Sequence, residues 1–302
     1  MSFFGNLLKK TKGTIQRNDY NILYQPAEPN RVNIEHSAVD NVGDHLGPVI
    51  ADWVLSARGI DAGRTISRTR HLMTIGSIIG RGMFDCTIWG SGILKEENRD
   101  RIVKLRRRYR RKMDIRAVRG PVTRDLILSA GYDCPEVYGD PAVLLPLIYQ
   151  PAPCEKVYET TVILHHRTKK TTAQNDSGEA YVMEIGEELI ERCHLHFLDP
   201  ATADWKAFVD ELVRSRRVIS SSLHGIILAE AYGIPTVFLN WGMDDQQIKF
   251  RDWYLSTGRE LQCAKSLEEA IEAPSAPLPQ LDDMRQTLID CFPYDLWEVS
   301  EA

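Results

Sequence analysis

The 302-residue chain has few cysteines, no strong excess of charge of either sign and no long apolar run. Its six cysteines are scattered without CxxC spacing, which excludes a disulfide scaffold and favours a reducing, cytoplasmic setting. The net charge of -5 excludes a surface that attracts nucleic acid everywhere, so we expect no nucleic-acid partner. Apolar stretches such as residues 142–149 are far shorter than the roughly 20 residues that cross a bilayer, and we find no export signal.

What the chain does have is the composition of an ordinary globular protein, with 43% hydrophobic and 26% charged residues. Its length exceeds the size at which a single hydrophobic core keeps growing, so we expect two domains. Residues 147–158 contain two prolines and no apolar period, which is typical of a linker. The predicted domains are 1–150 and 151–302, and the second ends in a helical tail.

Apolar residues recur with the periods of alternating strands and helices. Residues 1–20 are expected to form a weakly ordered arm, and residues 168–179 a polar loop. The alternation of strands and helices predicts an α/β fold of two doubly wound, Rossmann-like domains that face a central cleft. We expect strands at 71–79, 86–89, 114–118, 137–138, 161–164, 194–198, 218–220 and 236–239, and helices at 46–57, 96–112, 121–130, 184–193, 204–217 and 226–232. One or two further helices are expected at 281–297, with a break at Pro293.

The most informative segment is 218–239, which predicts a strand, a loop, a helix and another strand. Serines at 220–222 can cap the helix, whose free N–H groups and positive dipole form an anion site at the end of a parallel strand. His224 stands beside that site, where an imidazole can bind phosphate or act as a general acid. The alternative is a histidine that only caps the helix or is hydrogen-bonded in a loop. The predicted binding residues here are Ser221, Ser222, Leu223 and Gly225.

A second polar cluster ends the strand predicted at 161–164. In a doubly wound sheet this edge faces the ligand crevice, and the planar guanidinium of Arg167 suits a carboxylate or a phosphate. His165 and His166 cannot both face one ligand, because neighbouring side chains alternate along an extended strand. We take His166 as the binding candidate beside Arg167, and a solvated strand end is the alternative.

Two glycine turns lie in the first half of the chain. In the turn at 41–44, Asp44 either caps the following helix or faces a ligand. The turn Gly90, Ser91, Gly92 ends a strand where missing side chains let a ligand approach the backbone. It lacks the third glycine and the acidic residue of a dinucleotide fingerprint, so we reject a nicotinamide and expect no cofactor.

Two further features have weaker chemical meaning. Residues 104–112 contain seven basic side chains in nine positions, the pattern of a solvated helix face or of a peripheral contact with an anionic membrane. His194 and His196 could chelate a metal from one strand face, but no third ligand accompanies them, so we expect no metal.

In order and spacing, five segments resemble the motifs of the polysaccharide pyruvyl transferase family, over about residues 40–240. The resemblance implies a glycosyltransferase-B-like fold, phosphoenolpyruvate as donor, and a sugar of a surface polysaccharide or of its lipid-linked precursor as acceptor. The product would be a pyruvate ketal. The resemblance also implies substrate contacts for Asn41, Gly90, Ser91, Gly92, Arg119 and Asp140. The segments are Asn41-Val-Gly-Asp44, Trp89-Gly-Ser-Gly92, Val118-Arg119-Gly120, Gly139-Asp140-Pro141 and Ser221-Ser-Leu-His-Gly225.

One position departs from the family pattern. The family commonly has an arginine two residues before the loop histidine, where this chain has Ser222. Either Arg167, which matches the family's other donor-binding arginine, holds the donor's charge together with the backbone of residues 222–226, or the donor differs. We favour the first. His224 would then be the acid or a phosphate ligand, and Asp44 the base or an acceptor contact.

Two other functions stay open at this point. A glycosyltransferase that uses a nucleotide sugar would have the same predicted fold, and the helix that contains Glu230 also occurs in that group. A non-enzymatic protein would instead bind anionic lipid or nucleic acid through residues 104–112. The localisation that follows from the first function is the cytoplasm, with peripheral contact at the inner face of the plasma membrane.

Overall fold

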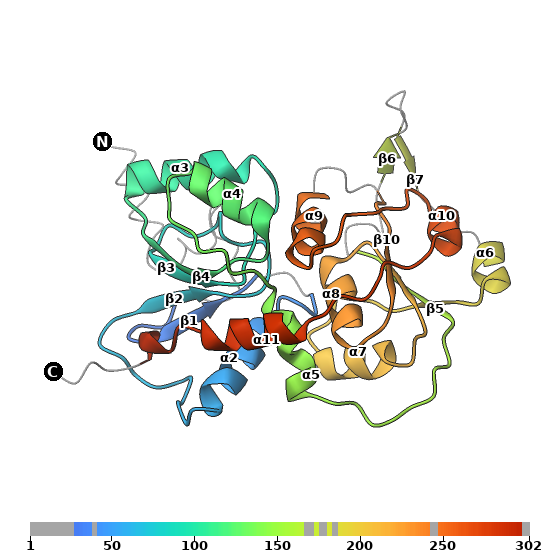
Figure 1. Ribbon diagram of the computed structural model, residues 1–302, viewed down its shortest axis with the longest axis horizontal. Coiled ribbons are helices and arrows are strands. Elements are labelled where there is room, and N and C mark those ends of the chain that lie inside the picture. Colours follow the sequence, from blue (N-terminus) through green and yellow to red (C-terminus); the bar gives the residue numbers. More distant parts are fainter. Residues whose placement is uncertain are drawn as a thin grey trace. The chain divides into compact units, whose positions relative to one another are not determined.

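The chain forms two compact units in the computed structural model (Figure 1). Unit 1 comprises residues 1–39, 47–141 and 284–302, and unit 2 comprises residues 40–46 and 142–283. Each unit contains its own four-stranded parallel sheet, as an α/β fold requires. The predicted arm lies outside the described residues, and the division at residue 150 stays a prediction. The structure describes residues 27–37, 41–165, 172–174, 180–182, 187–241 and 247–297.

Unit 1 is built on a sheet whose strands follow the order β1-β2-β3-β4. Helices α3 and α4 cover one face of this sheet, and α2 and α11 lie against the other (Figure 1). The elements are β1 (Val32–Glu35), α2 (Leu46–Ser56), β2 (Arg70–Met73), β3 (Cys86–Trp89), α3 (Asn98–Tyr109), β4 (Met113–Ala117), α4 (Pro121–Ser129), α11 (Asp282–Asp290) and the 3-10 helix η5 (Tyr294–Leu296).

Local sequence explains several of these boundaries. All four residues of β3 are buried, as the short apolar run predicted. Helix α4 begins with Pro121 in its first turn and is followed by Gly131, whose φ of 87° is left-handed. Helix α3 buries Ile102 and Leu105 against the sheet and keeps its basic residues outside.

Unit 1 also departs from the predictions. The strand predicted at 71–79 ends at Met73, because the chain turns at Gly76, where φ is 100°. Strand β1 was not predicted, and the strand expected at 137–138 is a single parallel bridge between Val118 and Tyr138. Among the strands that the structure describes in this unit, the order never reverses, so the doubly wound order is not seen here.

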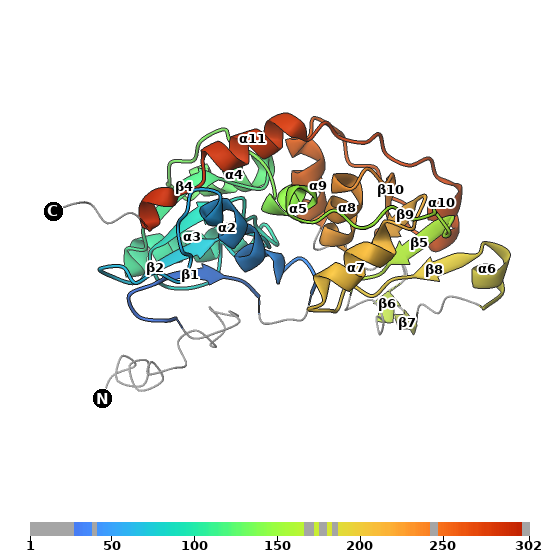
Figure 2. The same cartoon turned by 90° about the horizontal axis from the view of Figure 1, so that it is seen from below.

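Unit 2 has the strand order β10-β9-β5-β8, and Figure 2 shows these strands side by side. The chain places β8 on one side of β5 and then β9 and β10 on the other, so the order reverses between β5 and β9. This reversal is a topological switch point. The elements are the 3-10 helix η2 (Pro141–Leu144), α5 (Leu145–Ile148), β5 (Thr160–Ile163), β6 (Thr172–Gln174), β7 (Ala180–Val182), α6 (Glu187–Arg192), β8 (Leu195–Phe197), α7 (Trp205–Leu212), β9 (Val218–Ser220), α8 (Leu223–Ala231), β10 (Thr236–Phe238), α9 (Gln247–Ser256) and α10 (Leu267–Glu272).

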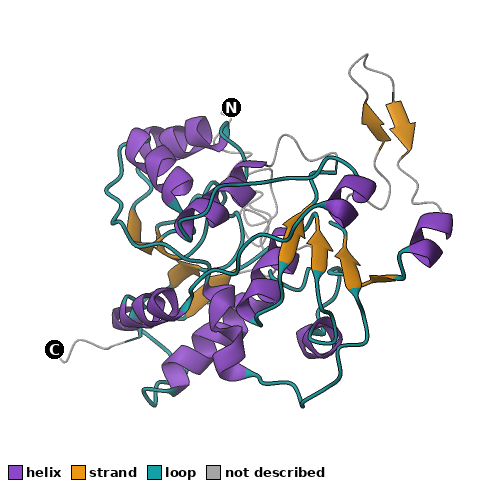
Figure 3. Ribbon diagram, turned by 45° about the vertical axis from the view of Figure 1, so that its right-hand side comes forward, coloured by secondary structure: helices purple, strands orange, loops and turns teal. Residues whose placement is uncertain are grey.

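Helix α8 is the central helix of unit 2 and packs against β9 and β10. All nine of its residues are buried, which fits its almost wholly apolar sequence. It begins at Leu223, three residues before the predicted start, so His224 belongs to its first turn. The predicted loop at 168–179 contains β6, which pairs with β7 in a small antiparallel hairpin apart from the parallel strands (Figure 3). Helices α9 and α10 were not predicted. Within the described ranges, no helix is both long enough and apolar enough to cross a lipid bilayer.

Candidate active site at the carboxyl edge of the second sheet

The loops that follow β5 and β9 meet at the switch point of unit 2. The backbone N–H of His165 donates to Ser221 Oγ at 2.8 Å, and the N–H of Ser221 donates to the Ile163 carbonyl at 3.1 Å. Ser220 Oγ donates to the same carbonyl at 2.9 Å. The ends of the two strands are therefore joined by buried hydrogen bonds at the edge where open α/β sheets bind ligands.

The serines do not cap helix α8, and this prediction was wrong. Ser222 is the N-cap residue and has an extended backbone, but its side chain makes no capping hydrogen bond. Its backbone N–H instead donates to Ser220 Oγ at 3.0 Å, within the loop. The hydroxyls of Ser220 and Ser221 thus shape the loop and tie it to β5.

Gly225 has a packing explanation of its own. A Cβ at this position would lie 2.5 Å from Ser220 Oγ and 2.9 Å from Ile163 Cγ2. Glycine therefore lets the first turn of α8 approach the strands closely. The predicted substrate contacts of Ser221, Ser222, Leu223 and Gly225 stay predictions.

His224 is buried and lies against the turn at residues 41–44, which belongs to the same unit. Its Nδ1 is 3.4 Å from Asn41 Oδ1, and that oxygen also accepts the Gly43 N–H at 3.0 Å. The Gly43 contact fixes which end of the amide is oxygen. Because an amide oxygen can only accept, Nδ1 must carry the proton in this contact, and Nε2 is an acceptor whenever the ring is neutral. His224 can donate from Nε2 only as the imidazolium.

Gly43 is required for this contact. A Cβ there would lie 1.9 Å from His224 Nδ1 and 2.0 Å from Cγ, so no side chain fits. The turn is anchored to unit 2 by the Val42 N–H, which donates to the Pro200 carbonyl at 2.8 Å. Asp44 is half-buried in the same turn. The sequence marked a glycine turn and a histidine separately, but nothing in it signalled that the first makes room for the second.

Two of the predicted residues, His166 and Arg167, lie outside the described residues. Their roles stay predictions. Their neighbour His165 is described and buried, and its backbone is held by Ser221 at the end of β5.

The family motifs of unit 1 form a filled cluster at the carboxyl edge of its sheet. Arg119 is fully buried, and its Nη1 and Nη2 groups donate to Ser77 Oγ at 2.8 Å and to the Ile93 carbonyl at 2.9 Å. A Cβ on Gly92 would lie 2.3 Å from Arg119 Cζ. Ser91 is also fully buried, and its hydroxyl donates to the Gly76 carbonyl at 2.7 Å.

Gly90 makes room in the same way. Its φ is 83°, and a Cβ would lie 2.3 Å from Pro141 Cδ and 2.8 Å from the Gly139 carbonyl oxygen. Asp140, between these two, is fully buried. The space that we expected a ligand to use is thus occupied by the protein's own atoms. Substrate contacts of Gly90, Ser91, Gly92, Arg119 and Asp140 stay predictions.

Glu230, which motivated the glycosyltransferase alternative, is engaged inside unit 2. Arg259 donates to its two carboxylate oxygens, each at 2.8 Å. Trp253 Nε1 donates at 2.9 Å, and Thr236 Oγ1 donates at 2.9 Å. This carboxylate is a buried structural group at the far end of α8 from His224.

Part of the basic segment is also structural. Arg111 is buried, and its side chain donates to the Ile79 and Phe84 carbonyls at 2.8 and 3.0 Å. The other six basic residues of the segment are exposed: Lys104, Arg106, Arg107, Arg108, Arg110 and Lys112. The prediction of one solvated basic face therefore holds for these six and is wrong for Arg111.

The candidate metal pair has other contacts. His196 stacks on Tyr158 with ring centroids 3.7 Å apart, and its Nε2 lies 3.3 Å from Glu211 Oε1. Burial lowers the pKa of His196, although Glu211 opposes the shift. In the described part of the chain, no three His, Cys, Asp or Glu side chains are grouped as metal ligands would be.

Fold and site together define an α/β protein whose second sheet holds a histidine at a switch point. Comparison with known proteins adds the family. The chain matches the polysaccharide pyruvyl transferase family model over residues 85–242, slightly more than half of its length, and it belongs to this family. The match includes β9, the serine loop and α8.

Two relatives are informative. An uncharacterized protein of Acanthamoeba polyphaga mimivirus is 27% identical over 222 residues, which cover 72% of this chain and 70% of that protein. The succinoglycan biosynthesis protein ExoV of Rhizobium meliloti is 25% identical over 146 residues, which cover 48% of this chain and 41% of ExoV.

Proposed function

We propose that this protein transfers a pyruvyl group from phosphoenolpyruvate to a sugar of a surface polysaccharide or of its lipid-linked precursor. Membership of the polysaccharide pyruvyl transferase family supports a transferase that acts on polysaccharide, and the likeness to a succinoglycan biosynthesis protein agrees with it. The observation that carries the proposal is the position of His224, held by Asn41 at the switch point where the loops after β5 and β9 are joined.

In this proposal Arg167 and the backbone of residues 222–226 hold the charged groups of the donor. His224, at the head of α8, protonates the donor's methylene carbon or binds its phosphate. Asp44, in the turn that carries Asn41, accepts a proton from an acceptor hydroxyl. No cofactor takes part.

The chemistry needs one acid and one base. Protonation of the methylene carbon makes the central carbon of phosphoenolpyruvate electrophilic, and one acceptor hydroxyl attacks it. Phosphate leaves with the bonding electrons, and a second hydroxyl closes the pyruvate ketal. Of the two hydroxyl protons, one replaces the proton that the acid gave to the methyl group, and the other leaves with phosphate.

The Asn41 contact adds a requirement to this mechanism. A neutral His224 has its proton on Nδ1, so only the imidazolium can donate from Nε2. As a general acid, His224 would therefore have to be the imidazolium.

The proposal includes a glycosyltransferase-B-like pair of domains, with the acceptor on the first and the donor on the second. It also places the protein in the cytoplasm, at the inner face of the plasma membrane. There the exposed basic residues of α3 would meet anionic lipid, worth about 1 kcal/mol for each charge near the surface.

Phosphate release and product mass test the proposal. The purified protein would be incubated with phosphoenolpyruvate and a lipid-linked oligosaccharide extract. We expect His224→Ala and Arg167→Ala to lower turnover by at least about 100-fold. His194→Asn and Arg192→Ala are matched controls, because both residues are exposed and lie away from the switch point. Rates near wild type in both test variants would refute the assignment.

The nucleotide-sugar alternative is not proposed, because the carboxylate of Glu230 is already bound by Arg259, Trp253 and Thr236. Thermal unfolding still separates the two functions, since a ligand that binds only the native state raises its melting temperature. We expect a rise with phosphoenolpyruvate and none with a panel of nucleotide sugars. The opposite pattern would favour the glycosyltransferase.

A further inference from the structure

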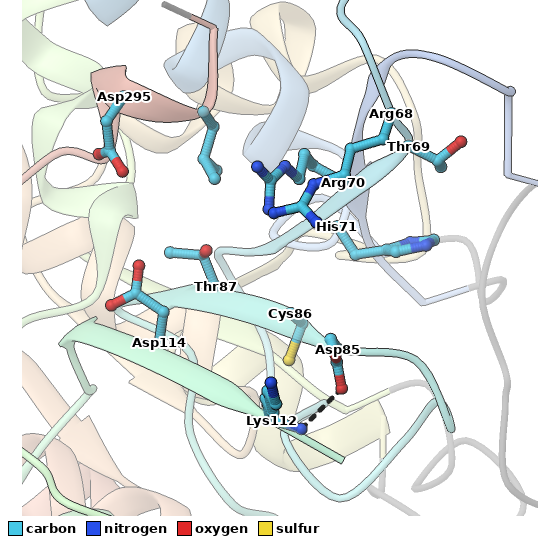
Figure 4. A pocket seen from close by; sticks show the side chains of 11 residues that line it. Arg68, Thr69, Arg70, His71, Asp85, Cys86, Thr87, Lys112, Asp114 and Asp295 are labelled. Carbon is cyan, nitrogen blue, oxygen red and sulfur yellow. Dashed lines mark hydrogen bonds between the residues drawn. The ribbon is translucent and has the colours of Figure 1, made fainter. Parts of the chain in front are cut away.

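A hollow of about 350 Å³ lies at the amino edge of the sheet of unit 1 (Figure 4). It is lined from the starts of β2, β3 and β4 and from η5. The family motifs Gly90–Gly92 and Arg119 follow β3 and β4, at the opposite, carboxyl edge of the same sheet. The hollow is therefore separate from the cluster that those motifs form.

Two arginines dominate the hollow. Arg68 and Arg70 come from the segment that leads into β2, and their guanidinium groups lie near each other and point into the hollow (Figure 4). Within the ranges that the structure describes, neither side chain has an ion pair or a hydrogen bond. Two neighbouring cations that form no ion pair repel each other, and a bound anion would relieve that repulsion.

The acidic residues around the hollow already form ion pairs or hydrogen bonds with other groups of the protein. Arg116 bridges Asp114 and Asp295, each at 2.8 Å. Asp85 accepts the backbone N–H of Lys112 at 2.7 Å (Figure 4). Within the described ranges none of these carboxylates forms an ion pair with Arg68 or Arg70, so the two guanidinium groups keep their N–H donors for a ligand.

The polar groups across from the arginines suit the hydroxyl groups of a ligand rather than its charged group. Thr87 and Asp114 are register partners on β3 and β4, so their side chains are on one face of the sheet, with Asp295 of η5 nearby (Figure 4). Hydroxyl and carboxylate oxygens in such a row can exchange hydrogen bonds with the hydroxyls of a sugar. The volume is in the range of small-molecule sites, roughly 300–1,000 Å³.

We propose that this hollow binds a sugar that carries a phosphate or a carboxylate group. The forks of Arg68 and Arg70 would take the oxyanion, since guanidinium geometry matches both anions. Thr87, Asp114 and Asp295 would take the hydroxyls of the ring. The proposal does not depend on pyruvyl transfer, because none of these residues belongs to the candidate active site.

Calorimetric titration of the full chain tests the anion half of this proposal. The probes are glucose 6-phosphate, glucuronate and neutral glucose. We expect the two anionic sugars to bind and glucose not to bind. Arg68→Gln and Arg70→Gln should each weaken binding of the anionic sugars by at least about tenfold, as loss of a charged hydrogen bond implies. Arg64→Gln is the matched control, an exposed arginine of the same segment outside the hollow.

Equal binding of glucose and glucose 6-phosphate, or unchanged affinity in both test variants, would overturn the proposal. Arg68 is exposed, so its variant is expected to fold even if the Arg70 variant does not. Comparison of glucuronate with glucose 6-phosphate distinguishes a carboxylate from a phosphate as the preferred anion.

Titration with inorganic phosphate tests whether the hollow recognises the sugar ring as well as the anion. Thr87→Val, which keeps the side chain's shape, should weaken glucose 6-phosphate several-fold and leave inorganic phosphate unchanged. If inorganic phosphate binds as tightly as glucose 6-phosphate to the wild-type chain, the hollow does not recognise sugar, and that half of the proposal is wrong.

Discussion

The carboxyl edges of the two sheets use glycine for different purposes. In unit 1, Gly90 and Gly92 make room for Pro141 and Arg119, so the protein fills the space with its own atoms. In unit 2, Gly43 makes room for the imidazole of His224, which lies at the head of a buried helix. The same kind of residue therefore makes room for packing atoms in one unit and for an imidazole ring in the other.

Topology accounts for the difference. The described strands of unit 1 follow one another across the sheet, and no reversal separates their loops. In unit 2 the order reverses between β5 and β9, and such a reversal is where open α/β sheets bind ligands. A glycine turn at the end of a strand is thus a weak indication of a ligand site unless the strand order also reverses there.

The largest expected effect tests whether the two ends of α8 have separate roles, with Glu230 stabilising the fold and His224 serving the proposed activity. Glu230→Gln should lower the free energy of unfolding by about 3–5 kcal/mol, because it leaves the largely buried Arg259 without its partner charge. Below the melting temperature the variant should retain transferase activity, since Glu230 lies at the far end of the helix from His224. Urea unfolding and phosphate release measure the two effects. Loss of activity in the folded variant would show that the two ends of α8 are not separable.

The next prediction concerns Gly43. Gly43→Ala places a Cβ within 2.5 Å of three atoms of the His224 ring, so the ring or the turn must move. We expect activity to fall by about 100-fold, as displacement of a catalytic group by about 1 Å can do. The far-UV circular dichroism spectrum should stay unchanged. Initial-rate kinetics provide the measurement, and a rate within a few-fold of wild type would argue against a role for His224.

The sequence was sufficient for much of the fold, because the decisive signals there are local. The buried run of β3, and Pro121 and Gly131 around α4, each mark an element within a few neighbouring residues. Helix α8 was predicted to begin too late because Ser222 and the residues after it carry no strong helical signal of their own. Their helical conformation depends on packing against the sheet.

The site was less predictable, because its contacts join distant parts of the chain. Asn41 and His224 are 183 residues apart in sequence, so no local pattern reports their contact. The sequence identified both residues as candidates and assigned Asn41 to the substrate, a role that stays a prediction, but it did not predict the contact of Asn41 with the histidine ring. The glycines at 90 and 92 were interpreted as leaving space for a ligand. Their contacts with Pro141 and Arg119 also join distant parts of the chain, so the sequence does not show them.

A smaller effect tests the packing role of glycine in unit 1. Gly92→Ala should lower stability by about 1–3 kcal/mol, the usual cost of overpacking, because Arg119 has no space to yield. The matched control is Gly59→Ala. An added Cβ at Gly59 would have no atom within 4 Å, but the φ of 69° is unsuited to alanine, so any loss of stability there comes from the backbone alone. Thermal unfolding compares the two. A smaller cost for Gly92→Ala than for the control would contradict the packing explanation.

The smallest expected effect is the response of His196 in unit 2 to acid. Burial lowers the pKa of His196 from 6.5, so as pH falls the unfolded chain takes up the proton before the folded chain does. The stability that the neutral ring contributes is therefore complete above that pH and is lost as the pH falls below it. Urea unfolding at about pH 7.5 and about pH 5.5 should show this loss in the wild-type chain, and His196→Phe should reduce it because the phenyl ring keeps the stack on Tyr158 but cannot be protonated. An equal acid loss in His196→Phe would assign the pH dependence to another group.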